Sequence, residues 1–347
     1  MLFQRFILAA AFGATLLPAQ PSGQDLLDSG HFKRLRAVLA TRNANDPETL
    51  ILSAAVKQLW GDLDTAEKLA ERAVAADPRS ARYHYRLADI EGEKASKASV
   101  FSQFGLARRF KKEAETAIEL DPNHVPALKE VMEFHLQAPA VIGGDKAKAR
   151  AIAEHLMKID PVEGYHAQVT LARFDKQPER IEGLLRKAVE VRPASYDAHL
   201  ALADWCGMQK KFEEAERHAR EAVRLQPDRA APYGLLAAAL VQQGKWTDLD
   251  AALAQAEKAD SDNLYPYYRA ANNCLGRKVE LPRAEGYLRK YLEQEPEPHS
   301  PSLAVAHWRL GLVLEQQGRK PEAIAELQQA IKLDANSPAK ADWKRLK

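Results

Sequence analysis

The feature that most constrains this chain is a dipeptide, Asp-Pro, that returns along most of its length. Asp-Pro occurs four times, and degraded forms of it continue the series at similar intervals. The sites are Asp46-Pro47, Asp77-Pro78, Asp121-Pro122, Asp160-Pro161, Arg192-Pro193, Gln226-Pro227, Asp260-Ser261, Glu295-Pro296 and Asp334-Ala335. Because proline displaces the preceding residue from the α region, each site is predicted to end a helix. The separation is 34 residues from 192 to 226 and again from 226 to 260, which indicates tandem helical units of that length.

Small residues recur at set places inside each unit. In residues 304–334, Gly311 lies midway along a first predicted helix, Gly318 makes a turn, and Ala323 and Ala330 share one face of a second helix. Small side chains let two helices approach closely while larger partner side chains fill the remaining space. Each unit is therefore predicted to be an antiparallel helix pair. Glycine tolerates the left-handed backbone of such a turn, and we expect it at Gly30, Gly61, Gly144, Gly244 and Gly318.

This pattern resembles the tetratricopeptide-repeat family over nearly all of the chain beyond residue 20, with about eight repeats and a degenerate half-repeat. The resemblance implies an all-α fold, a right-handed α-solenoid of antiparallel helix pairs that forms a TPR superhelix. We expect an N-terminal linker and half-repeat at residues 20–47, the repeat array at 48–337 and a capping segment at 338–347. Two units exceed the period, which places insertions near 92–112 and 138–148.

Residues 1–19 have the pattern of a secretory signal peptide. Arg5 supplies the positive start, residues 6–17 are an apolar run, and Ala19 ends a small-residue site. The alternative is an uncleaved anchor, because Leu17 is bulkier than such a site prefers. The stretch from Phe104 to Gly144 also resembles a group of bacterial exported repeat proteins. We therefore expect an exported chain, periplasmic or secreted, with no membrane span once the signal peptide is removed.

The composition and motifs argue against catalysis and against nucleic-acid binding. The net charge is only +2, too small for a nucleic-acid partner on bulk electrostatics. The ten histidines do not cluster and are expected to be surface or half-buried, and neither a zinc motif nor a nucleophile elbow occurs. We expect no catalytic residue, no metal and no cofactor. Cys206 and Cys274 fall two repeats apart, too far for a disulfide, and are predicted to be buried free thiols.

Two segments leave an alternative open. Gly143-Gly144 before a predicted helix could form an anion-binding nest, or could be only an elongated turn. The basic and aromatic residues of 101–112 could bind an acidic peptide, a phospholipid headgroup or nucleic acid. They could equally form a helix with phenylalanine inward and basic side chains outward.

The family resemblance implies that the first helix of each pair lines the concave side of the stack. We expect a protein or peptide partner to be held there, with the chain acting as a scaffold or assembly factor in the bacterial cell envelope. The alternative is a self-associating structural spacer. Tyr85 and Trp308 are candidate aromatic anchors, although either ring could pack against a neighbouring repeat instead. The expected partner-binding positions are Arg82, Tyr85, Asp89, Lys129, Glu133, Asp204, Arg269, Asn273, Arg277 and Trp308.

Overall fold

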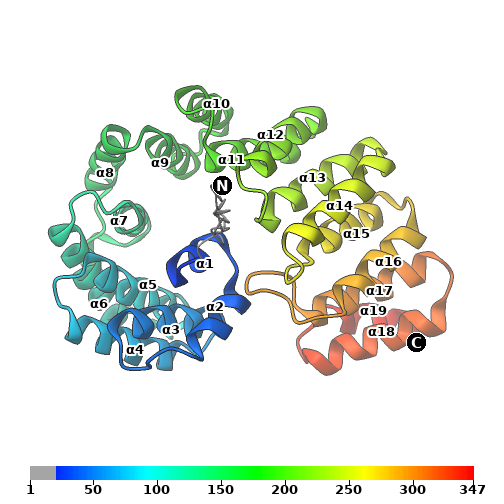
Figure 1. The fold of residues 1–347 in the computed structure, drawn as a ribbon, viewed down its shortest axis with the longest axis horizontal. Helices are drawn as coiled ribbons and strands as arrows, with labels where there is room; N and C mark the ends of the chain where they lie inside the picture. The colour runs from blue at the N-terminus through cyan, green and yellow to red at the C-terminus, as the bar shows by residue number, and fades with distance from the viewer. Residues whose placement is uncertain (1–20) are drawn as a thin grey trace, which may run out of the picture.

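The computed structural model describes residues 21–347, and within that range it contains nineteen α-helices and no strand. The helices follow one another as antiparallel pairs in a curved array (Figure 1). The predicted all-α solenoid is therefore confirmed. The predicted signal peptide at 1–19 lies outside the described residues.

Eight consecutive helix pairs make up the array. They are α3 (Pro47–Leu59) with α4 (Leu63–Ala76), α5 (Ala81–Lys97) with α6 (Val100–Leu120), α7 (Val125–Gln137) with α8 (Lys146–Ile159), α9 (Pro161–Phe174) with α10 (Ile181–Val191), α11 (Tyr196–Met208) with α12 (Phe212–Leu225), α13 (Ala230–Gln243) with α14 (Trp246–Ala259), α15 (Tyr265–Arg277) with α16 (Leu281–Tyr291), and α17 (Leu303–Gln316) with α18 (Lys320–Leu333). A short hairpin, α1 (Gly23–Ser29) and α2 (Phe32–Leu39), precedes them, and α19 (Ala339–Leu346) follows.

The Asp-Pro sites begin helices as well as ending them. As predicted, α4, α6 and α8 each end directly before such a site. At Asp46 the prediction is wrong, because α2 has already ended at Leu39 and the site instead starts α3. The Asp46 carboxylate accepts a hydrogen bond from the backbone N–H of Thr49 at 2.9 Å. Pro47 occupies the first turn, where a helix needs no backbone donor.

Polar rings tie the start of several first helices to the loop before them. In each case the ring donates a hydrogen bond to the carbonyl of the proline six residues earlier. This bond satisfies a loop carbonyl that would otherwise lack a partner. The three pairs are His84 with Pro78 (3.1 Å), His199 with Pro193 (2.9 Å) and Tyr233 with Pro227 (3.0 Å).

Two of the histidines meet inside one helix pair, which the sequence did not predict. His199 of α11 and His218 of α12 are both buried, and their Nδ1 atoms lie 2.9 Å apart. Since the Pro193 carbonyl can only accept, a neutral His199 carries its proton on Nε2, and its Nδ1 then accepts from His218. The expectation that all histidines are surface or half-buried is therefore wrong here.

Acidification is expected to destabilise the fold at this histidine pair. Burial, followed by the proximity of His199, lowers the pKa of His218 from 6.5 to about 4. Between these values the unfolded chain binds more protons than the folded one, so stability falls as the pH falls through that window. The melting temperature of the wild type should drop more across this range than that of His218→Gln, whose amide does not titrate. Parallel profiles would contradict this assignment.

The first insertion lengthens helices, whereas the second adds a loop. Helices α5 and α6 have 17 and 21 residues, against 13 and 14 in α3 and α4. In the second insertion a 3₁₀ turn, Ala140–Ile142, leads into Gly143, which has a φ of 97°. The predicted turn glycine, Gly144, is wrong by one position. Gly144 is needed for space instead, because a Cβ there would lie 1.8 Å from the Ala138 carbonyl oxygen.

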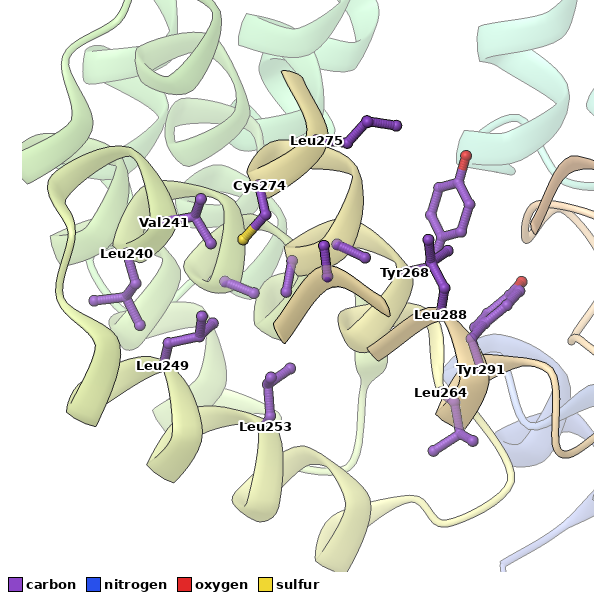
Figure 2. Close-up of a cluster of buried hydrophobic side chains, with 14 of the residues drawn as sticks. Leu240, Val241, Leu249, Leu253, Leu264, Tyr268, Cys274, Leu275, Leu288 and Tyr291 are labelled. Carbon is purple, nitrogen blue, oxygen red and sulfur yellow. The ribbon is translucent and has the colours of Figure 1, made fainter. Parts of the chain in front are cut away.

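The core lies between the helices, where the small-residue columns meet larger side chains. Figure 2 shows one such cluster, in which Leu240, Leu249 and Leu253 pack around the small residues of α15. The alanines predicted on the second helices, including Ala215, Ala284 and Ala323, are fully or almost fully buried. Cys206 and Cys274 are buried free thiols, as predicted. The close approach of small residues therefore holds the pairs together.

The array curves until its beginning and its later repeats lie on either side of the α1–α2 hairpin (Figure 1). The hairpin lies next to the loop that joins α16 to α17. Its contacts with the loops before α15 and α17 link residues that are more than 220 positions apart in the chain. The hairpin thus joins the two sides of a nearly closed ring.

Candidate interaction surface

Equivalent positions of five first helices form a groove along the inner face of the array. The helices are α7, α9, α11, α13 and α15, and each contributes one residue to a column in which successive members are 34 positions apart. This column is Lys129, Glu163, Asp197, Ala231 and Tyr265. One helical turn further, Ala201, Leu235 and Arg269 form a second column, and the hollow that both line has a volume of about 400 Å³. Adjoining hollows extend this inner groove in both directions.

Five of the ten residues expected at the partner-binding surface line this inner groove. They are contributed by three different helices, α7, α11 and α15, and the fold brings them together along one surface. The five residues are Lys129, Glu133, Asp204, Arg269 and Asn273.

One corner of the inner groove is held by a charged triad. Lys129 donates to Glu163 at 2.8 Å, and His166 Nδ1 lies 3.8 Å from the same carboxylate. The interactions with His166 and Lys129 lower the pKa of Glu163 to about 2. Glu163 is therefore ionised at neutral pH and restrains the Lys129 side chain.

Other charged groups of the inner groove are left free. Glu133 and Asp204 are exposed and take part in no ion pair among residues 21–347. Arg269 is half-buried, with its guanidinium 6.0 Å from the ring centre of Tyr265, and its Nε has no hydrogen-bond partner within the described chain. Asn273 is already engaged, since it accepts from Gln242 at 3.0 Å.

The inner groove carries no excess of one charge. Its lining includes four acidic side chains and four basic ones. A groove with balanced charges recognises a partner through the local arrangement of groups, because no single-sign field steers the encounter. The acidic residues are Glu133, Glu163, Asp197 and Asp204, and the basic ones are Lys129, Arg173, Lys210 and Arg269.

The two candidate aromatic anchors both pack against neighbouring helices. Tyr85 on α5 donates to Glu130 on α7 at 3.1 Å, and its ring centre lies 5.1 Å from that of His124. Burial raises the pKa of Tyr85, and burial followed by the nearby Asp89 raises the pKa of Glu130 to about 8. Trp308 donates to Asp342 of α19 at 2.8 Å. Of the two interpretations of these rings, the structure shows packing against the neighbouring element.

The remaining expected positions are also engaged within the chain. Arg82 pairs with Glu48 and donates to Gln24 of α1 at 2.7 Å. Asp89 pairs with Arg86 at 2.7 Å, and Arg277 donates to the Val241 carbonyl. These three residues lie outside the hollows that make up the inner groove.

The structure does not support the anion-nest interpretation of Gly143-Gly144. The carboxylate of Asp145 accepts from the backbone N–H groups of Ala147 and Lys148, at 2.9 and 3.2 Å. An anion at the start of α8 would compete with this side chain for the same donors. The loop instead packs on α7, where His135 Nδ1 lies 3.0 Å from the Gly143 carbonyl oxygen.

The basic and aromatic segment is divided between core and surface. Phe110 is buried against Phe134, whereas Phe104 is 45% exposed. Arg109 pairs with Glu67 at 2.6 Å. The alternative interpretation is a helix with phenylalanine inward and basic side chains outward. It holds for Phe110 but not for Phe104.

Sequence reasoning missed the α1–α2 hairpin as part of this surface. A cavity of about 450 Å³ separates the hairpin from the first turns of α11 and α13, and it is lined by Leu27 and Phe32 on one side and by Tyr196, Asp197 and Leu200 on the other. The only sequence signal is the cluster of basic residues in His31-Phe32-Lys33-Arg34-Leu35-Arg36 within the degenerate half-repeat.

Comparison with known families matches residues 61–92 and 275–338 to a tetratricopeptide-repeat family. Similar solved structures include yeast Tom70, with 14% identity, a TM-score of 0.47, and coverage of 94% of this chain and 86% of that chain. The APC/C Cut9–Hcn1 hetero-tetramer is similar with 13% identity, a TM-score of 0.46, and coverage of 93% of this chain and 75% of that chain. Pseudomonas aeruginosa PilF is similar with 15% identity, a TM-score of 0.43, and coverage of 64% of this chain and 97% of that chain. No curated protein matches the chain by sequence. Among the residues described, no helix combines the length and apolar character needed to cross a membrane.

Proposed function

We propose that this chain of tetratricopeptide repeats holds an extended segment of another polypeptide in the inner groove, as a scaffold or assembly factor of the bacterial cell envelope. It acts by binding and carries out no chemistry of its own. Proteins built from such repeats are generally interaction scaffolds.

The observation that carries this proposal is the column of equivalent residues spaced by one repeat. Neighbouring helices of this kind pack about 8–10 Å apart, and an extended chain advances about 3.3 Å per residue. A bound segment therefore meets a new member of the column about every third residue. Side chains of different chemistry in that column, from Lys129 to Tyr265, would then select the partner by its pattern.

Position-specific crosslinking tests this proposal. A photo-reactive amino acid placed at Asp204, inside the inner groove, should crosslink a defined partner polypeptide in cells. The same amino acid at Glu213, which is exposed on the outer helix α12, should not. The charge reversal Arg269→Glu should reduce the crosslink at position 204 several-fold, because it removes the groove's half-buried guanidinium. The same partner captured with equal yield at both positions, or undiminished by Arg269→Glu, would remove the groove from the proposal.

The envelope setting of the proposal is supported by residues 1–19, with their positive start and apolar run. A protease added to intact bacteria with a permeabilised outer membrane should degrade the full-length chain. A chain that begins after Ala19 should stay protected in the same cells. Protection of both forms would place the protein in the cytoplasm and contradict the envelope setting.

A further inference from the structure

The α1–α2 hairpin is joined to the start of the array by apolar packing. Leu35 is fully buried and Leu26 is 4% exposed, and both belong to one cluster with Leu50 and Leu52 of α3. The hairpin itself is well formed, because Ser22 and Asp25 make a reciprocal capping box and Gly30 supplies the left-handed turn. On this side the hairpin shares one apolar core with the first helix pair of the array.

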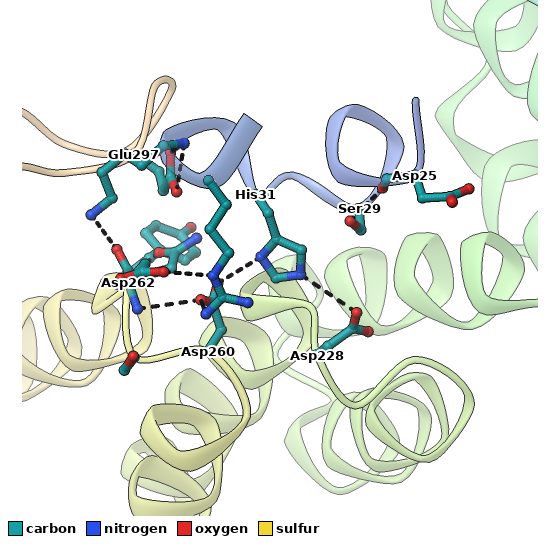
Figure 3. Close-up of polar contacts among 12 residues, drawn as sticks. Asp25, Ser29, His31, Asp228, Asp260, Asp262 and Glu297 are labelled. Atoms are coloured by element: carbon teal, nitrogen blue, oxygen red, sulfur yellow. Dashed lines mark hydrogen bonds and ion pairs between the residues drawn. The ribbon is translucent and has the colours of Figure 1, made fainter. Parts of the chain in front are cut away.

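Its contacts with the other side of the ring are mostly polar, apart from Phe32, whose ring centre lies 6.4 Å from that of His299. Arg34 Nε donates to Asp262 Oδ2 at 2.6 Å, and Arg34 Nη2 donates to Asp260 Oδ1 at 2.9 Å. His31 lies between two carboxylates, 3.2 Å from Asp260 and 3.4 Å from Asp228 (Figure 3). All three carboxylates belong to the loops that precede α13 and α15.

A second group of contacts reaches the loop between α16 and α17. The backbone N–H of Lys33 donates to the buried Glu297 at 3.1 Å, and Lys33 Nζ donates to the Glu295 carbonyl at 2.8 Å. Arg36 pairs with the Glu295 carboxylate at 2.9 Å while its guanidinium lies 4.4 Å from the ring centre of Trp60. Trp60 donates to the same carboxylate at 3.1 Å.

The two sides of the hairpin therefore differ in how they respond to salt. Among the described residues, the apolar cluster around Leu35 and the cluster that spans α11 to α18 share no buried residue. The ion pairs Arg34–Asp262 and Arg36–Glu295 join partly exposed side chains, so they are weak individually and are screened by salt. Apolar burial is not screened by salt, and the buried His31–Asp260 pair is screened much less. The side of the hairpin that salt can weaken is therefore the one that faces the loops at 260–262 and 295–297.

From this asymmetry we infer that the α1–α2 hairpin is an electrostatic latch that closes the ring and controls entry of a polypeptide to the inner groove. The inference rests on the proposed function of that groove. The cavity that the hairpin bounds shares Asp197, Ala231 and Tyr265 with the inner groove, so the hairpin covers one approach to it. Release of the polar contacts would swing the latch away together with the first repeat and open that approach.

The latch is tested by the accessibility of a cysteine placed beneath it. Asp197→Cys in the full chain introduces a thiol into the lining of the cavity that the hairpin bounds, and the native Cys206 and Cys274 are fully buried. With a small maleimide the labelling rate should be high in every variant. With a polymer-linked maleimide the labelling rate should be low in the closed ring. The labelling rate with the polymer-linked reagent, divided by the rate with the small one, should rise several-fold in Arg34→Glu with Arg36→Glu. This rate ratio should fall back when Asp262→Arg and Glu295→Arg are added.

A matched control uses the same change of charge where no contact spans the ring. Within residues 21–347, Arg217 and Arg224 pair only inside α12, with Glu214 and Glu221. Arg217→Glu with Arg224→Glu should therefore leave the rate ratio unchanged. A second test uses the Asp197→Cys chain with its latch residues unchanged. Rising salt concentration should increase the rate ratio of this chain. A ratio that stays constant with salt, or that is equal in the latch variant and this control, overturns the latch. The assay contains no partner, so its failure is distinct from a failure of crosslinking at Asp204.

Discussion

Replacing Tyr291 by alanine is expected to lower the free energy of unfolding by about 3–5 kcal/mol, the range for loss of a large buried aromatic side chain. Tyr291 is the last residue of α16 and is only 2% exposed. Its ring centre lies 5.4 Å from that of Tyr268, and its hydroxyl donates to the Pro301 carbonyl at 2.6 Å. The substitution removes this packing and also frees the loop at 292–302, which holds the second half of the latch contacts.

Tyr291→Phe separates the two effects. It keeps the ring in the core and removes only the hydrogen bond, so the loss should be about 1 kcal/mol. Urea denaturation followed by circular dichroism measures both values, and hydrogen exchange of residues 292–302 should accelerate in both variants. Equal losses for alanine and phenylalanine would show that the ring does not support the core.

Replacing Gly164 by alanine is the second large effect, with an expected loss of about 1–3 kcal/mol from overpacking. A Cβ on Gly164 would lie 2.4 Å from the Cα and 2.7 Å from the backbone nitrogen of Met157. Because the obstruction is backbone, no rotamer change relieves it, and α8 and α9 must move apart. This cost exceeds the gain of roughly 1 kcal/mol that alanine brings to a helix interior.

Gly183→Ala is the matched control for this substitution. Gly183 lies in the neighbouring helix α10, and a Cβ there would meet no atom within 4 Å. The same chemical change should therefore raise stability, by about 0.5–1 kcal/mol. Urea denaturation of both variants should give shifts of opposite sign. A Gly164→Ala protein as stable as the wild type would mean that the α8–α9 contact is looser than the structure indicates.

The repeat architecture could be predicted because its signals are local. A proline acts on the residue before it, and small residues act on the helix that packs directly against them. The shared helix face of Ala323 and Ala330, for example, can be recognised within a single repeat. For the same reason Lys129, Asp204 and Arg269 could be assigned to the inner face, since a position in the first helix faces the same way in every repeat.

The ring closure could not be predicted in this way. Small rotations between repeats add up along the array, and where its two sides meet depends on their sum. The contact between Arg34 and Asp262 joins residues 228 positions apart, and neither residue carries a recognisable motif. The His199–His218 contact was missed for a related reason, because the two positions face each other only once the side-chain packing of α11 on α12 is known.

Tyr85 and Trp308 show a different limit. Each ring stands at the border between the inner face and the contact with the next helix. The position of the residue within its repeat therefore fits both an exposed ring and a packed one. The partner that each ring finds, Glu130 for Tyr85 and Asp342 for Trp308, is a particular side chain of the next element. Repeat phase alone carries no information about that side chain.

The placement of the hairpin has a consequence for the order of synthesis. Helices α1 and α2 are made well before the acidic residues that their basic side chains contact, because those residues lie between Asp228 and Glu297 and follow the first five helix pairs of the array. During translation the early helices can fold on α3 while their basic side chains still face water. Ring closure is thus a late, long-range step, and loop-closure entropy makes such steps slow. A slow final phase in refolding, absent from Arg34→Glu with Arg36→Glu, would be its kinetic signature.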